Sequence, residues 1–98
     1  MPPAEKKKVL APYQLSYQQD LESHLRLSKA NEKFYADAVA QTRASLEQCG
    51  NCKDRQVYID ALAAWEKGGA ESYAKNKATY DAKKAKLDEI NQVIASLG

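Results

Sequence analysis

The sequence has few of the residues that break helices or form tight turns. It contains four glycines and three prolines in 98 residues. These residues are Pro2, Pro3, Pro12, Gly50, Gly68, Gly69 and Gly98. Strands joined by tight turns need turn residues at much shorter intervals, so this spacing argues against a sheet-rich fold. Lys, Glu, Ala, Gln and Leu dominate the chain instead, and these residues favour long helices.

Large apolar residues are also scarce. Leu, Ile, Val and Phe together make up 17 of the 98 residues, which is below the roughly 20% at which disorder becomes a concern. Disorder also requires a high net charge, however, and the formal net charge here is only +2. We therefore predict one small folded domain with a thin core, which needs self-association or a partner protein for stability.

No part of the chain approaches the roughly 18 consecutive apolar residues of a transmembrane helix. The basic start EKKKVLAP leads into no hydrophobic signal region. We therefore expect no transmembrane segment, and a cytoplasmic or virion location for the chain as written. A periplasmic or extracellular location would follow if a signal peptide had been removed.

The first eleven residues combine prolines with three consecutive lysines and show no helical period. We predict a flexible basic arm over residues 1–11 and a single helical domain over residues 12–98. Pro12 suits the first position of a helix, because a proline there loses no intrahelical hydrogen bond. Neither glycine nor proline occurs from Tyr13 to Cys49, so the first helix is expected to fill this stretch.

Residues spaced alternately three and four apart predict the buried face of each helix. In the first helix this row is Leu21, Leu25, Ser28, Glu32, Tyr35, Val39, Thr42, Leu46 and Cys49. In the second helix one row is Ile59, Glu66, Tyr73, Tyr80, Leu87 and Ile94, and the other is Leu62, Gly69, Asn76, Lys83, Ile90 and Leu97. The predicted fold is all-α, an antiparallel two-helix hairpin that resembles a coiled coil.

The predicted elbow of this hairpin is the stretch CGNC, residues 49–52. Gly50 lies where the end of a helix needs a left-handed residue. Asn51 can cap the next helix, with Asp54 near the positive end of its dipole.

A second interruption is expected at Gly68-Gly69. Two glycines cost a helix roughly 2 kcal/mol relative to two alanines. The second helix is therefore expected either to kink at this pair or to break there, with a third helix from Ala70 onward.

The chain has only two cysteines, Cys49 and Cys52, and they allow several interpretations. The favoured interpretation is structural, either a local disulfide or reduced thiols that line the elbow. A disulfide would indicate an oxidising compartment. Haem attachment is disfavoured, because Lys53 stands where a Cys-x-x-Cys-His motif has its histidine.

Two alternatives give the elbow cysteines a chemical role. CGNC resembles the Cys-Gly-x-Cys of thioredoxin-like oxidoreductases, but those enzymes place it after a strand and no strand is predicted here. Cys52 would be the activated thiol, because Cys49 closes a helix. A Cys-x-x-Cys at a coiled-coil apex is also similar to the zinc hook of DNA-repair coiled-coil ATPases. That resemblance implies one zinc ion held by Cys49 and Cys52 of two chains.

No residue pattern points to an enzyme or to a cofactor. His24 is the only histidine and has no partner residue for metal binding or acid–base chemistry. No phosphate-binding glycine loop, nucleophile elbow or metalloprotease motif is present. Tyrosines and lysines alternate in YAKNKATYDAKKAKL, which makes nucleic-acid binding an alternative. The pattern favours a solvated helical face over that alternative, because Tyr73 and Tyr80 belong to a predicted buried row.

The predicted pairing of the two helices about the elbow suggests a function. It places Trp65 opposite Tyr35, and it carries the end of the second helix beyond the start of the first. The apolar side chains left uncovered at that end are Ile90, Val93, Ile94 and Leu97. We predict that they bind a protein partner, either a second copy or a larger assembly. The alternative is that they pack within the chain against Val9, Leu10 and Tyr13. The chain is accordingly expected to be a structural or assembly subunit of a phage particle or of secretion or envelope machinery.

Overall fold

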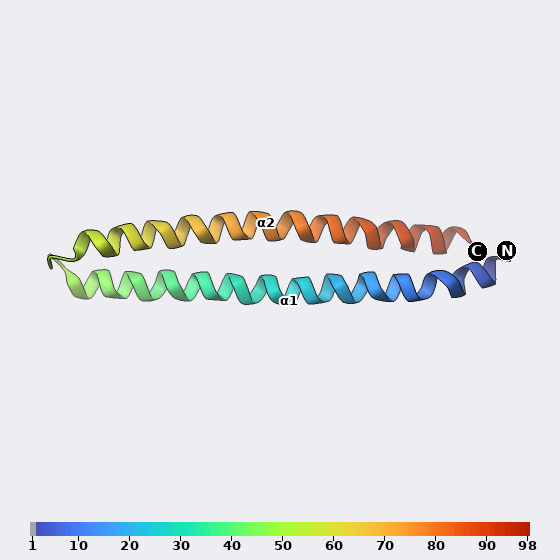
Figure 1. Cartoon of the computed structure of the whole chain (residues 1–98), viewed down its shortest axis with the longest axis horizontal. Coiled ribbons are helices and arrows are strands. Elements are labelled where there is room, and N and C mark those ends of the chain that lie inside the picture. Colours follow the sequence, from blue (N-terminus) through green and yellow to red (C-terminus); the bar gives the residue numbers. More distant parts are fainter. Residues whose placement is uncertain (1) are drawn as a thin grey trace. The chain divides into compact units, whose positions relative to one another are not determined.

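The computed structural model describes residues 2–98 and consists of two long helices. α1 spans Pro3–Cys49 and α2 spans Arg55–Ser96 (Figure 1). The two helices run antiparallel and pack against each other, and no strand occurs within the described residues. The predicted all-α helical hairpin is therefore confirmed.

The contacts divide the chain into two compact units, which we describe separately. The terminal half comprises the residues up to Leu27 together with Lys77–Gly98, and the elbow half comprises Ser28–Asn76. Each half therefore contains one segment of α1 and one segment of α2. The two ends of the described chain lie beside each other in the terminal half (Figure 1).

The N-terminal boundary of α1 differs from the prediction. The helix begins at Pro3, so residues 3–11 are helical and Pro12 lies inside the helix rather than at its first position. The predicted start at Pro12 is therefore wrong. The mobility of this segment stays a prediction.

Contacts with α2 explain why the helix continues through Pro12. A proline inside a helix costs about 3 kcal/mol, because it removes one hydrogen bond and clashes with the preceding turn. On either side of it, Leu10 is half-buried and lines a groove with Ile90. Gln14 donates a hydrogen bond from Nε2 to Oδ1 of Asn91 at 2.6 Å. These tertiary interactions offset part of the cost of the proline.

The elbow consists of residues 50–54, between the end of α1 and the start of α2. Gly50 has a φ of 57°, which is the left-handed conformation predicted for the end of the first helix. The predicted cap at Asn51 is wrong, because α2 begins only at Arg55. The carbonyl of Asp54 accepts the first hydrogen bond of the new helix instead.

The predicted buried rows are confirmed in part. All of the row Leu62, Gly69, Asn76, Lys83, Ile90 and Leu97 is buried or half-buried, as are Leu21, Ser28, Tyr35, Val39, Thr42, Leu46 and Cys49 in α1. The predictions of burial for Leu25, Glu32, Ile59, Glu66 and Tyr73 are wrong. The second half-buried row of α2 follows Tyr58, Trp65 and Ser72 in the elbow half and Tyr80, Leu87 and Ile94 in the terminal half. In the elbow half this row therefore lies one residue before the predicted row. The reason is that a strict seven-residue spacing drifts by about 20° per heptad on a straight helix.

Gly68 and Gly69 do not interrupt α2. The helix is continuous through both glycines, so no third helix follows them, and neither has a positive φ. Both face Tyr35 of α1 in the elbow half. A Cβ added to Gly68 would lie 3.2 Å from Cε1 of Tyr35, and one added to Gly69 would lie 3.2 Å from its Cβ. The predicted break is absent because the glycines let α1 and α2 approach closely, and that packing offsets their low helix propensity.

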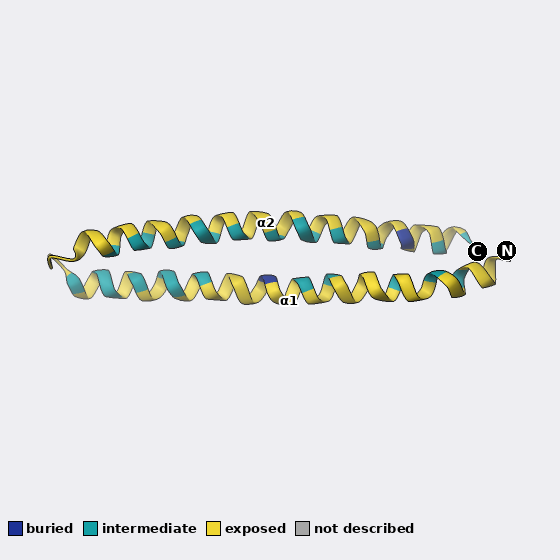
Figure 2. Ribbon diagram, in the orientation of Figure 1, coloured by how far each residue is buried: buried dark blue, intermediate teal, exposed yellow. Residues whose placement is uncertain are grey.

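The core of the hairpin is thin. Within the described residues, Ile90 is the one large apolar side chain that is buried, at 9% exposure, and no large side chain is completely buried. In each half, the buried and half-buried positions lie on the sides of α1 and α2 that face each other (Figure 2). Large apolar side chains remain exposed in both halves, so the hairpin alone does not enclose its apolar surface.

Candidate functional site

The terminal half contains a groove between α1 and α2 that is made of two adjoining hollows. Tyr17 and Lys86 line both of them. The larger hollow has a volume of about 460 Å³ and is completed by Asp20, Ala78, Thr79, Ala82 and Lys83. The smaller has a volume of about 320 Å³ and is completed by Leu10, Glu89, Ile90 and Val93. We call the two hollows together the terminal groove.

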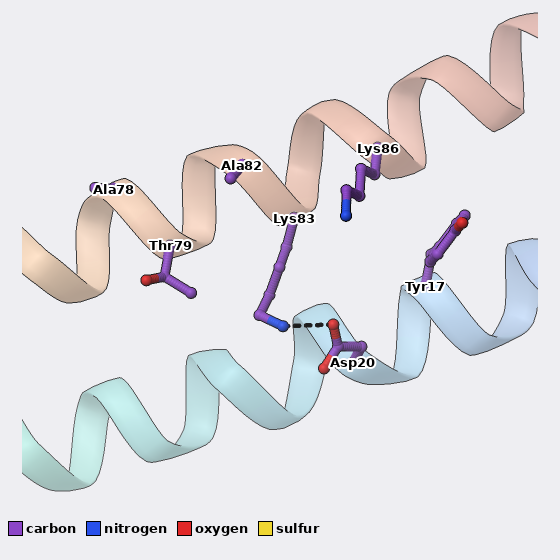
Figure 3. Close-up of a pocket in the computed structure, with 7 residues that line it drawn as sticks. All are labelled: Tyr17, Asp20, Ala78, Thr79, Ala82, Lys83 and Lys86. Atoms are coloured by element: carbon purple, nitrogen blue, oxygen red, sulfur yellow. Dashed lines mark hydrogen bonds and ion pairs between the residues drawn. The ribbon is translucent and has the colours of Figure 1, made fainter.

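Small side chains on α2 open the larger hollow. Ala78 and Ala82 lie one turn apart on the same side of α2, and their methyl groups fill little of the space between the helices. Figure 3 shows Tyr17 on α1 at one side of this hollow, with Lys86 extending toward the space from α2. Ala78 and Ala82 are both exposed, so the larger hollow is open to solvent beside them.

Charged groups of both signs line the terminal groove. Nζ of Lys83 on α2 lies 2.5 Å from Oδ2 of Asp20 on α1, which closes one side of the larger hollow (Figure 3). Lys86 and Glu89 form no ion pair within residues 2–98. The terminal groove therefore offers one cation and one anion to a binding partner.

An apolar stripe runs along α1 beside the terminal groove. Val9, Tyr13 and Tyr17 follow one another at intervals of four residues, so they lie along one side of the helix. Their exposed fractions are 52%, 57% and 36%, and Val93 at the edge of the groove is 45% exposed. We call Val9, Tyr13 and Tyr17 the tyrosine stripe. Together with the smaller hollow it forms the apolar part of this surface.

The four apolar residues predicted to bind a partner lie in the terminal half, but the reason given for that prediction is wrong. α1 begins at Pro3 and therefore covers the end of α2. Ile90 is buried, Ile94 and Leu97 are half-buried, and Val93 alone is exposed. Ile90 and Val93 nevertheless line the smaller hollow. A role for all four residues in partner binding stays a prediction.

The terminal groove was not anticipated from the sequence. The sequence signal for this groove is weak, because alanine is a good helix former. Ala78 and Ala82 are therefore expected in a helix whether or not a groove lies beside them. The tyrosine stripe could have been found from its four-residue spacing. The predicted basic arm over residues 1–11 hid it, because it treated Val9 as part of a mobile segment.

The elbow half contains an aromatic cluster, in which Trp65 lies near Tyr35 as predicted. The ring centroids of Tyr35 and Trp65 are 6.1 Å apart, and Phe34 lies 5.4 Å from Tyr35 and 5.8 Å from Trp65. Arg43 on α1 donates to Oε1 of Glu66 on α2 at 2.9 Å. Tyr35 and Trp65 are half-buried, whereas Phe34 is exposed at the edge of the cluster. A hollow of about 270 Å³ remains beside Tyr35, Trp65 and Gly69.

Cys49 and Cys52 are joined by a disulfide, and their Cα atoms lie 5.1 Å apart. Cys49 is the last residue of α1 and is half-buried, whereas Cys52 is exposed in the elbow. The N–H of Cys52 donates to the carbonyl of Cys49 at 3.0 Å, and the N–H of Arg55 donates to the carbonyl of Cys52 at 3.2 Å. Nη1 of Arg55 also donates to the carbonyl of Gly50 at 2.6 Å. The elbow is thus held by hydrogen bonds as well as by the disulfide.

The zinc alternative would require two chains. Within residues 2–98, no group of three or more His, Cys, Asp or Glu side chains is placed to hold a metal ion. Cys49 and Cys52 supply two sulfur ligands, and a tetrahedral site shared at the elbow needs two more. A zinc-linked dimer therefore stays a prediction.

The lysines that suggested nucleic-acid binding mostly face carboxylates. Lys77 pairs with Asp81 at 3.3 Å, and Lys84 pairs with Asp88 at 3.2 Å. Lys83 is occupied by Asp20, as described above. Phosphate binding would have to compete with these ion pairs, so the structure adds no support to that alternative.

No known protein family, curated protein or solved structure matches this chain. Within residues 2–98, neither helix has a stretch that is both long and apolar enough to cross a membrane.

Proposed function

We propose that this protein is a non-enzymatic assembly subunit that self-associates through the terminal groove and the tyrosine stripe. The observation that carries the proposal is the exposed apolar surface of the terminal half, which surrounds a concave site. Tyr13 and Val9 are more than half exposed, although they belong to the same half as the one buried apolar side chain, Ile90.

The free energy of folding gives such a surface a physical reason. Most of the stability of a helix in a protein comes from packing of its apolar face rather than from helix propensity. Burial stabilises by about 25 cal/mol per Å² of apolar surface. Within residues 2–98, Ile90 is the one large apolar side chain that is buried and the others are at most half-buried, so covering the tyrosine stripe would add to the stability of the hairpin.

The charges that line the terminal groove favour a second copy of the chain as its binding partner. Lys86 and Glu89 both line the terminal groove, and neither forms an ion pair within residues 2–98. In a twofold dimer, residues of one surface meet the same surface of the other copy. Lys86 of each copy can then face Glu89 of the other, while the tyrosine stripes cover each other.

Sedimentation equilibrium over a range from about 1 to 500 μM tests the proposal. We expect a reversible dimer whose affinity drops at least about tenfold when Tyr13 and Tyr17 are both changed to serine, because their burial is lost. Leu15→Ser is the matched control, since Leu15 is 55% exposed but lies two residues from Tyr17 and hence on another side of α1. A monomer at every concentration, or equal losses in the test and control variants, would contradict the proposal.

A charge exchange makes the test more specific. Lys86→Glu and Glu89→Lys should each weaken the dimer, because each places like charges opposite each other. The double variant should recover most of the lost affinity, since it restores opposite charges across the interface. Circular dichroism should show the same helicity in all three variants. Failure of the double variant to recover would exclude this pairing of the two copies.

A further inference from the structure

The elbow disulfide joins two cysteines whose surroundings differ. Cys49 ends α1 and is half-buried, and Cys52 is exposed in the connection that leads into α2. We infer that this disulfide is a reversible thiol–disulfide exchange site, in which Cys52 is the sulfur that forms mixed disulfides with thiols of the glutathione class. The inference rests on the elbow and is independent of the proposed self-association.

The elbow is built to keep its shape in both redox states. Gly50 supplies the left-handed residue that ends α1, and its φ of 57° suits glycine without strain. The backbone hydrogen bond from Cys52 to Cys49 and the two bonds donated by Arg55 do not depend on the sulfur atoms. Reduction would therefore remove one covalent bond and leave the turn in place. A disulfide whose two states share one fold can cycle between them.

The charges around the elbow favour a thiolate at Cys52 over one at Cys49. Cys52 is followed by Lys53 and Arg55, with Asp54 as the one acid among these three residues. It also precedes the first turn of α2, whose partial positive charge stabilises an anion. Cys49 lies at the opposite end of a helix dipole, because it is the last residue of α1. A thiolate there gains no such stabilisation.

The exchange proceeds in two steps that conserve atoms and electrons. A thiolate of glutathione attacks Sγ of Cys52, which belongs to the more exposed of the two cysteines. The bond between the two protein sulfurs breaks, and Cys49 leaves with the electron pair and takes a proton from water. A second glutathione thiolate attacks the glutathione sulfur of the mixed disulfide, and Cys52 leaves as a thiolate. The protein disulfide is reduced by two electrons, and two glutathione molecules are oxidised to their disulfide.

Single-cysteine variants of the full chain test the assignment of Cys52. Cys49→Ser leaves Cys52 alone, and Cys52→Ser leaves Cys49 alone, so each is the control for the other. With oxidised glutathione at pH 7, we expect Cys52 to form the mixed disulfide about tenfold faster than Cys49, as measured by mass spectrometry. Adding Arg55→Gln to Cys49→Ser should slow that reaction severalfold. Equal rates at the two cysteines would overturn the inference.

The unmodified chain gives the second measurement. Equilibration in glutathione buffers of increasing reducing power should convert the disulfide to the dithiol in one two-electron step, with unchanged helicity by circular dichroism. Loss of helicity on reduction would show a structural staple and overturn the inference. Stable zinc uptake by the reduced chain, with one ion for two chains and no further reaction with oxidised glutathione, would favour the zinc-linked dimer and also overturn it.

Discussion

The two halves of the hairpin differ in what the small residues of α2 meet on α1. In the elbow half, Gly68 and Gly69 receive the ring and the Cβ of Tyr35 at contact distances. In the terminal half, Ala78 and Ala82 border an open hollow instead. Gly69 also lines a hollow of about 270 Å³ together with Tyr35 and Trp65. A small residue therefore permits both a close approach and a groove.

The contacts that join α1 to α2 also differ between the halves. The elbow half has the aromatic cluster and the Arg43–Glu66 ion pair. The terminal half has the buried Ile90 but no aromatic cluster, and its polar contacts join Gln14 to Asn91 and Asp20 to Lys83. Exposed polar contacts of this kind contribute about 1 kcal/mol or less each. We therefore expect the terminal half to open more readily than the elbow half, and three sets of variants test this comparison.

The largest effect is expected from Pro12→Ala in the terminal half. The change restores a backbone hydrogen bond inside α1 and removes a steric clash, so it should stabilise the monomer by up to about 3 kcal/mol. Urea unfolding at low protein concentration measures this gain, and hydrogen exchange locates it. The amides near residue 12 should become more protected, and the difference between the halves should shrink.

Pro3→Ala is the matched control, because Pro3 is the first residue of α1. A proline at that position loses no hydrogen bond, so the change should alter stability by only a few tenths of a kcal/mol. A negligible gain from Pro12→Ala would mean that α1 is not continuous through Pro12 in solution.

An intermediate effect is expected from truncating one tyrosine in each half. Tyr35→Ala should destabilise the monomer by about 2 kcal/mol, because it leaves a space against Gly68 and Gly69. Tyr17→Ala should cost the monomer less than about 1 kcal/mol, because this ring lines an open groove and is 36% exposed. Thermal unfolding at low concentration compares the two. Equal losses of stability in the two variants would contradict the expected difference in packing between the two tyrosines.

The smallest effects are expected from replacing each of the two adjacent glycines with alanine, and the two changes should differ in sign. In Gly69→Ala the new Cβ would meet the Cβ of Tyr35 at 3.2 Å, and that atom cannot move without its backbone. The clash should outweigh the gain in helix propensity and destabilise by about 1 kcal/mol. In Gly68→Ala the neighbour at 3.2 Å is Cε1, at the edge of the Tyr35 ring.

The ring edge can shift, so Gly68→Ala should be neutral or stabilising by up to about 1 kcal/mol. Urea unfolding of both variants checks the sign of each change. Two stabilising substitutions would show that the close approach of α1 and α2 in the elbow half is not required.

Local signals in the sequence were sufficient for the elbow but not for the helix boundaries. Gly50 was recognised from its position after a long uninterrupted helix, and the cysteines beside it were expected to form a disulfide or line the turn. Pro12 was interpreted as a helix start, and Gly68-Gly69 as a kink or a break, because each disfavours a helix locally. In the structure both are helical, since contacts from Leu10, Gln14 and Tyr35 offset their costs.

The candidate site depended even more on contacts between the two helices. Ile90, Val93, Ile94 and Leu97 were predicted to be uncovered because α1 was expected to start at Pro12. Because α1 starts at Pro3, it covers three of these residues. The exposed apolar surface is formed instead by the tyrosine stripe and the terminal groove. One misplaced boundary was therefore enough to misplace the proposed surface.

The sequence by itself determined that this protein is two helices joined at Gly50. Composition, helical periodicity and the scarcity of turn residues are local properties. All three favour a helix along nearly the whole chain. Tertiary structure alone decided that α1 includes Pro12, that α2 runs through Gly68 and Gly69, and that a groove opens at Ala78 and Ala82. The physical reason is that each of these features depends on the residue that faces it from the other helix, and a single helix contains no information about that neighbour.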